Sequence, residues 1–213
     1  MAYPSLNCSS PTAPGRSKQL EHRIGSSMRS RDATSECGDR CGWWATSERI
    51  VMAVVDSLGR GPDEAYAVNL AMACIGGGLE RSFAEIFTAC DARLRNTRGV
   101  ALAVAMIDLA SGALTMASVG NVRGVLLSAN KEYRMGVTAG IAGGDHARLN
   151  PLIKKLSSGD VLMLCSDSVN VLSSLRETLA SSAPYAREQA LAVLHQWARA
   201  DDDAAVLIYH HAS

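Results

Sequence analysis

The stretch that decides the fold is IVMAVVD at residues 50–56, in which six apolar residues run straight into Asp56. Short apolar runs bounded by turn residues are typical of buried strands. Two other apolar runs border aspartates, and a further aspartate follows a glycine: VLMLCSD at residues 161–167, DDDAAVLIY at residues 201–209 and CGD at residues 37–39. The pattern predicts buried strands whose ends carry carboxylates.

Strand ends that converge would bring several of these carboxylates together. Like charges at close range cannot all stay ionised unless a cation neutralises them. Hard divalent ions that prefer oxygen ligands, Mg²⁺ or Mn²⁺, suit such a cluster. The aspartates therefore indicate a site for two metal ions.

Length and composition indicate one globular domain with a tail. The chain has 213 residues, of which 47% are hydrophobic and 20% charged, an ordinary globular balance. Residues 1–18, rich in proline and serine, are predicted to be a flexible N-terminal tail, and residues 19–213 the domain. The net charge of zero argues against binding to nucleic acid or an anionic membrane. No apolar stretch of membrane-spanning length and no signal-peptide pattern is present, so a cytoplasmic protein is expected.

The six cysteines form no repeating frame. Three of them, Cys74, Cys90 and Cys165, fall inside apolar patterns, which suits reduced core thiols in the cytoplasm. Cys37 and Cys41 are spaced like half a zinc site, but a second pair at ligand spacing is not evident. For His210-His211 three interpretations are open: an affinity remnant, a weak metal site or plain surface histidines. Trp43-Trp44 is interpreted as strand or core packing, with ligand stacking as the alternative.

Periodicity places the remaining elements. Helical spacing of apolar residues or helix-forming composition marks four segments: residues 63–74, 79–94, 169–180 and 185–200. Further strands are predicted at residues 100–108, 113–119 and 125–128, with an edge strand within residues 22–34 and a glycine-rich loop or short strand at residues 136–144. Strands come in hairpins and helices in pairs, which favours an α+β fold with antiparallel sheets covered by helices.

Residues 56–62 (DSLGRGP) resemble the DGxGHG loop of the metal-dependent PPM protein phosphatases, in their bacterial SpoIIE-like subgroup. Three more segments are similar to acidic motifs of that family, in the same order and at matching spacing: residues 38–39 (GD), residues 158–167 (SGD followed by SD) and residues 202–203 (DD). Residues 96–99 (NTRG) and 118–123 (SVGNVR) resemble the RsbX group, the small phosphatases that reset the bacterial stressosome. The resemblance covers residues 20–213.

The resemblance implies a four-layer αββα sandwich, in which two antiparallel sheets are flanked by helix pairs. It also implies two Mn²⁺ or Mg²⁺ ions at one end of the sandwich. Asp56 would bridge the ions, Asp39, Asp167 and Asp202 would complete the carboxylate set, and the backbone carbonyl of Ser57 would bind one ion. Asp39, Asp56 and Asp167 would be the catalytic residues. Asp203 takes the place of Asp202 if the terminal motif is shifted by one residue.

The sequence departs from the family pattern at several positions. Two family glycines are serines, Ser57 and Ser168; the family histidine is Arg60, and the usual threonine near the end is Ala204 or Ala205. A backbone carbonyl can still bind metal at Ser57, but a positive φ there would cost about 1–3 kcal/mol.

Several polar residues have a second interpretation. Asp39, Asp56, Asp202 and Asp203 are each also compatible with turns, helix caps or solvated loops. Asp160 is interpreted as a turn residue. For Arg98 the alternatives are a phosphate or partner contact and a surface salt bridge, and for Asn121 support of the site and a turn position.

The resemblance implies a metal-dependent serine/threonine protein phosphatase. Its expected substrates are phosphorylated STAS-domain proteins of a stressosome, within a serine/threonine kinase circuit. Two alternatives are a pseudophosphatase that binds a phosphorylated STAS or kinase partner without turnover, and a small-molecule phosphatase.

Overall fold

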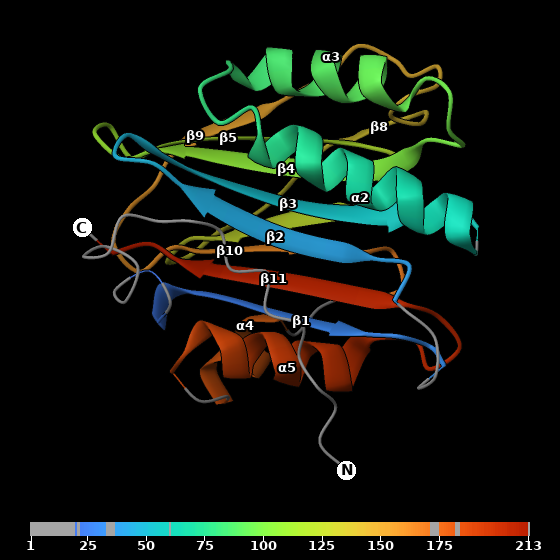
Figure 1. The fold of residues 1–213 in the computed structure, drawn as a ribbon. Helices are drawn as coiled ribbons and strands as arrows, with labels where there is room; N and C mark the ends of the chain where they lie inside the picture. Colours follow the sequence, from blue (N-terminus) through green and yellow to red (C-terminus); the bar gives the residue numbers. More distant parts are fainter. Residues whose placement is uncertain are drawn as a thin grey trace.

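The computed structural model describes residues 20, 22–32, 37–59, 61–170, 175–181 and 184–212. Two sheets lie face to face between two layers of helices, so the predicted αββα sandwich is confirmed (Figure 1). The first sheet has the order β2-β3-β4-β5-β8, with β9 paired to β5, and the second has the order β1-β11-β10-β6-β7. The predicted tail, residues 1–18, and Arg60 lie outside the described residues.

The strands of the first sheet are β2 (Arg40–Ala45), β3 (Arg49–Ser57), β4 (Val100–Asp108), β5 (Ala113–Val119), β8 (Val137–Thr138) and β9 (Leu152–Lys155). Those of the second are β1 (Ile24–Arg29), β6 (Arg123–Leu127), β7 (Glu132–Arg134), β10 (Val161–Cys165) and β11 (Ala204–His210). The helices are α2 (Pro62–Gly76), α3 (Phe83–Leu94), α4 (Leu175–Ser181) and α5 (Ala186–Trp197).

The position of β3 in the sandwich explains its unbroken apolar sequence. Met52 and Val54 belong to the core between the two sheets, whereas Val51 and Ala53 belong to the core beneath α2 and α3. Side chains of a strand alternate between its faces, so a strand covered on both faces has no polar positions. A third core lies between the second sheet and the helices α4 and α5.

Local sequence signals set the starts of the first helix pair. Pro62 occupies the first turn of α2 after Gly61, where its missing N–H costs nothing. The predicted second helix started at residue 79, but α3 begins at Phe83. Ser82 and Glu85 form a capping box there, which satisfies two helix N–H groups and defines the start.

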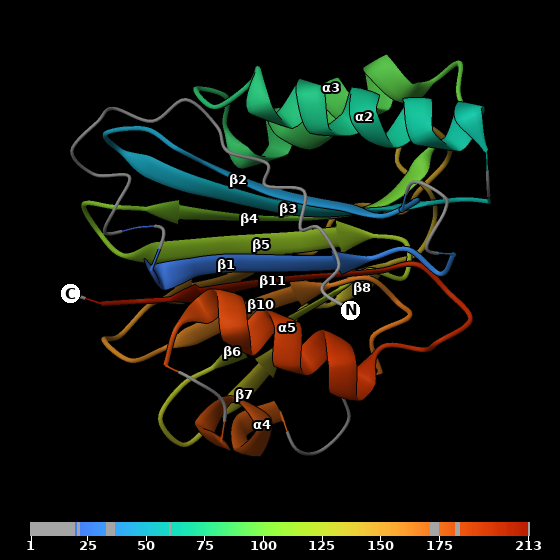
Figure 2. The same cartoon turned by 60° about the horizontal axis from the view of Figure 1, so that its bottom comes forward.

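The second helix pair also differs from prediction at its ends. Val169 is not helical, because it forms a β-bridge with Ala198; residues 171–174 lie outside the described residues, and α4 begins at Leu175. The predicted helix to residue 200 ends at Trp197, since Ala198 takes an extended conformation. Figure 2 shows α5 running along β1 and β11, the strands that it contacts.

Close packing of α5 on β1 depends on Gly25. A Cβ at this position would lie 2.1 Å from the backbone nitrogen of Arg187. A side chain therefore cannot be accommodated without moving the helix.

Two short strands, β7 and β9, were not predicted. Each has three or four residues with mixed polar sequence, too short for a periodic signal. Thr138 and Val137 form β8 inside the glycine-rich segment, one of the two predicted alternatives. Among the described helices, none combines the length and hydrophobicity needed to cross a membrane.

Candidate metal centre

Four strand ends meet at one end of the sandwich. β2 and β11 begin there, whereas β3 and β10 end there, because β2 pairs antiparallel with β3 and β10 with β11 (Figure 1). Arg40 lies opposite Val55 in the register, so the next positions along the two strands, Asp39 and Asp56, are neighbours. The predicted convergence of these two carboxylates is confirmed.

Burial and mutual repulsion make these two carboxyl groups hard to ionise. Asp39 is only 3% exposed, and burial raises its pKa from 3.8 to about 7. Burial and the charges of Asp39 and Asp167 raise the pKa of Asp56 from 3.8 to about 9. The two carboxyl groups also hydrogen bond to each other. At neutral pH the pair therefore keeps a proton, mainly on Asp56, and a cation would displace it.

Asp167 lies in the turn after β10, and its negative charge helps to raise the pKa of Asp56. The amide of Asn121 donates a hydrogen bond to a carboxylate oxygen of Asp167, at 2.5 Å from Nδ2 to Oδ2. Of the two interpretations of Asn121, the structure supports the one in which it orients a site residue.

The two aspartates before β11 are held differently. Asp203 accepts hydrogen bonds from the backbone N–H groups of Arg31 and Gly38, at 2.8 and 2.7 Å. Asp202 accepts one from the N–H of Asp203, at 3.0 Å, and its charge acts on both Asp39 and Asp56. Asp203 therefore holds two loops together, whereas the second oxygen of Asp202 lies 3.9 Å from a guanidinium nitrogen of Arg199.

Gly38 allows the segments around the site to approach closely. A Cβ there would lie 2.7 Å from Oγ of Ser57 and 2.8 Å from Oδ2 of Asp203. Next to this contact is a cavity of about 420 Å³, which includes Gly38, Ser57 and Asp203 in its lining together with Arg31 and Glu64. Because Gly38 has no side chain, Ser57 at the end of β3 and Asp203 just before β11 can both pack against it.

The two serines that replace family glycines fit without backbone strain. No described residue other than glycine has a positive φ, so Ser57 and Ser168 avoid the penalty considered above. In the loop after β3, the positive values belong to Gly59 and Gly61, at 121° and 123°. Ser168 is fully buried, and its hydroxyl hydrogen bonds with that of Ser166.

Two residues that the sequence did not single out support the centre. The hydroxyl of Ser166 accepts a hydrogen bond from the N–H of Ala205, and it also hydrogen bonds to Asp39. Glu64, 6% exposed in the first turn of α2, forms an ion pair with Arg98 at 3.4 Å. This ion pair is the surface salt bridge that was one alternative for Arg98. Ser166 belongs to the SD motif without a role assigned from the sequence, and Glu64 has no sequence signal beyond its place after the loop motif.

Other predicted residues take structural roles. Asp160 accepts hydrogen bonds from the Ser128 hydroxyl and the Ser157 N–H, so its interpretation as a turn residue is supported. Cys37 and Cys41 are buried free thiols. Burial raises the pKa of Cys37 to about 12, so this thiol stays protonated at neutral pH.

The donor set fits a hard divalent cation. Its candidate ligands are carboxylate oxygens and one backbone carbonyl, the donors preferred by Mg²⁺ and Mn²⁺. Within the described part of the chain, no three Asp, Glu, His or Cys side chains already converge as a metal cage. A third carboxylate, from Asp167 or Asp202, would join Asp39 and Asp56 only after its side chain rotates.

Comparisons with known proteins agree with this architecture. The family model of stage II sporulation protein E (SpoIIE) matches residues 46–212. The phosphoserine phosphatase RsbX of Bacillus subtilis (strain 168) is 26% identical over 147 residues, covering 66% of this chain and 71% of that protein.

Two solved structures are similar over most of their length. A chain from work on the bacterial stressosome, described as a modular system adapted to control secondary messenger signaling, has a TM-score of 0.81 and 29% identity; the match covers 87% of this chain and 97% of that one. RsbX in complex with magnesium has a TM-score of 0.78 and 20% identity, covering 89% and 96%. Because the family model spans most of the sequence, this chain belongs to the SpoIIE family of PPM-type serine/threonine phosphatases.

Proposed function

We propose that this chain hydrolyses phosphoserine or phosphothreonine in proteins, using two Mg²⁺ or Mn²⁺ ions at the strand-end centre. The observation that carries the proposal is the Asp39–Asp56 pair. Two adjacent acids with pKa values raised to about 7 and 9 destabilise the fold unless they serve a ligand. A divalent cation is the ligand that restores both as carboxylates.

The residues of the centre would have separate roles. The two ions would be held by Asp39, Asp56, Asp167, Asp202 and the backbone carbonyl of Ser57. Asp203 would keep the loop before β2 against the start of β11, through its bonds to Arg31 and Gly38. When bound, the ions would supply Lewis-acid chemistry, lowering the pKa of water and neutralising phosphoryl oxygens.

We further propose that the substrates are phosphorylated STAS-domain proteins of a cytoplasmic stressosome. The support is the relation to RsbX, a phosphoserine phosphatase, and to the chain from the bacterial stressosome work. The loop cavity of about 420 Å³ at the strand ends would receive the phosphorylated segment. A serine/threonine kinase would then supply the substrate of this phosphatase.

The test is phosphate release from a phosphoserine STAS protein, with Mg²⁺, Mn²⁺ or EDTA. Turnover should require a metal and fall at least about 10²–10³-fold in Asp56→Asn, the size of effect seen when a main electrostatic group is lost. Asp145→Asn, an exposed aspartate outside the centre, is the matched control and should retain activity.

The alternatives predict different results. Folded wild type that binds the phosphorylated STAS protein but releases no phosphate at saturating metal would establish a pseudophosphatase. Hydrolysis of p-nitrophenyl phosphate with no activity on any phosphoprotein would favour a small-molecule phosphatase.

A further inference from the structure

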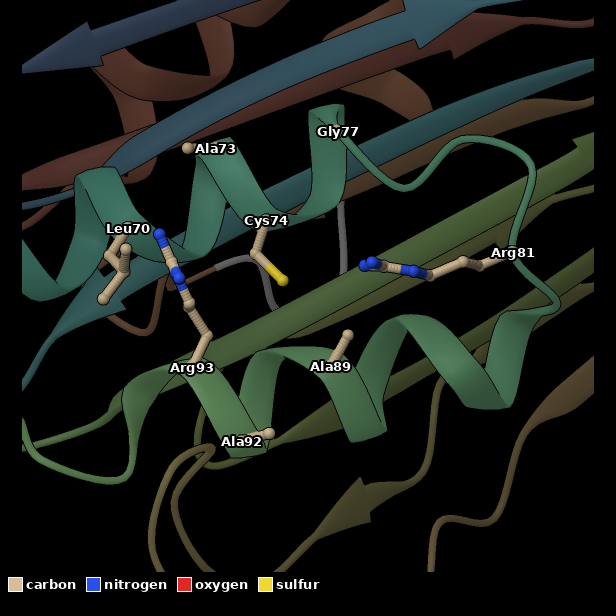
Figure 3. Close-up of a pocket in the computed structure, with 8 residues that line it drawn as sticks. All are labelled: Leu70, Ala73, Cys74, Gly77, Arg81, Ala89, Ala92 and Arg93. Carbon is tan, nitrogen blue, oxygen red and sulfur yellow. The ribbon is translucent and has the colours of Figure 1, made fainter.

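A groove runs between α2 and α3, away from the metal centre. Its volume is about 580 Å³, and it shares no lining residue with the cavity at the strand ends. The lining residues are Leu70, Ala73, Cys74, Gly77, Arg81, Ala89, Ala92 and Arg93 (Figure 3). The groove therefore belongs to the helix layer and is not an extension of the candidate active site.

Small side chains create the groove. Ala73 lies one turn before Gly77, the C-cap residue of α2, and Ala89 and Ala92 lie one turn apart on α3, so each pair faces the same side of its helix. The buried sides of both helices pack on the first sheet through larger residues. The short side chains thus leave space for an apolar surface from another molecule.

Two arginines supply the charge of the groove. Figure 3 shows Arg93 reaching from α3 toward Leu70 on α2, and Arg81 directing its guanidinium group into the space between the helices. Neither guanidinium group forms an ion pair with any described residue, and both residues are exposed. The sulfur of Cys74 points into the same space (Figure 3).

Three acidic residues of the two helices have partners other than these arginines. Glu64 is paired with Arg98 at the loop. Glu85 is used in the capping box with Ser82, although the charge of Arg81 reaches it. Asp91 binds the His146 ring at 2.9 Å. The groove lining therefore carries two positive charges and no negative one.

We propose that this groove is a docking site for an acidic segment of a partner protein. Carboxylates of the segment would pair with Arg81 and Arg93, and its small apolar side chains would lie on Ala73, Ala89 and Ala92. Arginine presents a planar, always charged donor set that suits carboxylates. The contact would be weakened by salt, because both guanidinium groups are exposed.

The probe is a fluorescent peptide of alternating glutamate and alanine, with a lysine–alanine twin as charge control. We expect the acidic peptide to bind in fluorescence anisotropy and the basic twin not to bind. Arg81→Glu combined with Arg93→Glu should weaken binding about tenfold or more. Arg95→Glu is the matched control for each of the two substitutions: it makes the same charge change as either one alone, on an exposed residue just after α3 and outside the lining, and should bind nearly as wild type.

Cys74 gives a second readout that locates the peptide. It is half-buried, whereas the other described cysteines, Cys37, Cys41, Cys90 and Cys165, are buried. Among the described cysteines, iodoacetamide should therefore label Cys74 first, and the acidic peptide should slow this labelling in wild type but not in the double variant. Mass spectrometry of the Cys74 fragment measures the rate.

Three results would overturn the inference. Equal binding of the two peptides would show that charge does not select the occupant. Acidic-peptide binding that leaves Cys74 labelling unchanged would place the peptide elsewhere. A wild-type dimer that becomes a monomer in the double variant, by sedimentation, would identify the occupant as a second copy of this chain.

Discussion

The Asp39–Asp56 pair of the strand-end centre and the two arginines of the α2–α3 groove both lack ion-pair partners among the described residues, but they differ in the sign of their charge and in burial. The Asp39 carboxyl group is almost fully buried, and burial raises its pKa to about 7. Arg81 and Arg93 are exposed, and water solvates their charge. Burial makes unpaired charge costly, so the centre needs a strongly bound ligand, whereas the groove tolerates being empty and suits a weaker, salt-sensitive partner.

The largest expected effect on stability comes from metal binding at the strand-end centre. Mg²⁺ or Mn²⁺ at about 100 times its Kd should add about 2.7 kcal/mol to the free energy of unfolding and raise Tm by roughly 5–10 °C. Calorimetry with and without EDTA measures this shift. No metal-induced rise in Tm would contradict the assignment of the centre.

This metal effect should depend on pH with a defined sign. The folded-state pKa values of Asp39 and Asp56, about 7 and 9, lie above the ordinary 3.8. The contribution of these groups to metal-free stability is therefore greatest below pH 4 and is lost as pH rises through 7 and 9. Metal displaces the protons, so its Tm increment should grow over the same range. An increment that shrinks from pH 6 to pH 9, with the metal still in solution, would contradict this linkage.

Substitutions of the neighbours Asp202 and Asp203 should have smaller effects on stability, and the two effects should differ. Asp203→Asn should lower metal-free stability by about 1–3 kcal/mol, because its carboxylate holds the N–H groups of Arg31 and Gly38. Asp202→Asn should change metal-free stability by less than about 0.5 kcal/mol but reduce the metal-induced Tm rise. Urea unfolding with and without metal measures the metal-free stability of each variant and the stabilisation that metal adds. The reverse pattern would assign the ligand to Asp203.

The smallest expected effect is at Ser57. Ser57→Gly should lower stability by about 0.5–1 kcal/mol, because glycine loses more conformational freedom in a strand, and should leave the metal-induced Tm rise unchanged. The reason is that Ser57 has no positive φ to relieve. A clearly larger metal increment in Ser57→Gly would mean that the serine weakens the centre.

Removing both arginines of the groove would test whether the groove and the metal centre are independent. The Arg81→Glu and Arg93→Glu double variant should retain the metal-induced Tm rise of wild type, since the two sites share no lining residue. Loss of that rise would show that the two regions are coupled.

The sequence by itself determined the sandwich and the identity of its acidic strand ends. β4, β5 and β10 have their predicted bounds, because long apolar runs ended by polar turns define buried strands without help from neighbours. Short segments such as β7 and β9 lack that periodicity, and they become strands only because β6 and β5 offer them hydrogen-bonding edges.

Only the tertiary structure decided how charges from distant segments meet. Asp39 and Asp56 are neighbours because of the β2–β3 register, and Asp203 binds Gly38 across 165 positions of the chain. The two arginines of the groove have no motif, and their positions follow from how α2 and α3 lie together on the sheet. The pattern of apolar residues in a sequence indicates which side chains of one helix or strand are buried. Whether a charged side chain finds a partner depends on all the elements that pack around it.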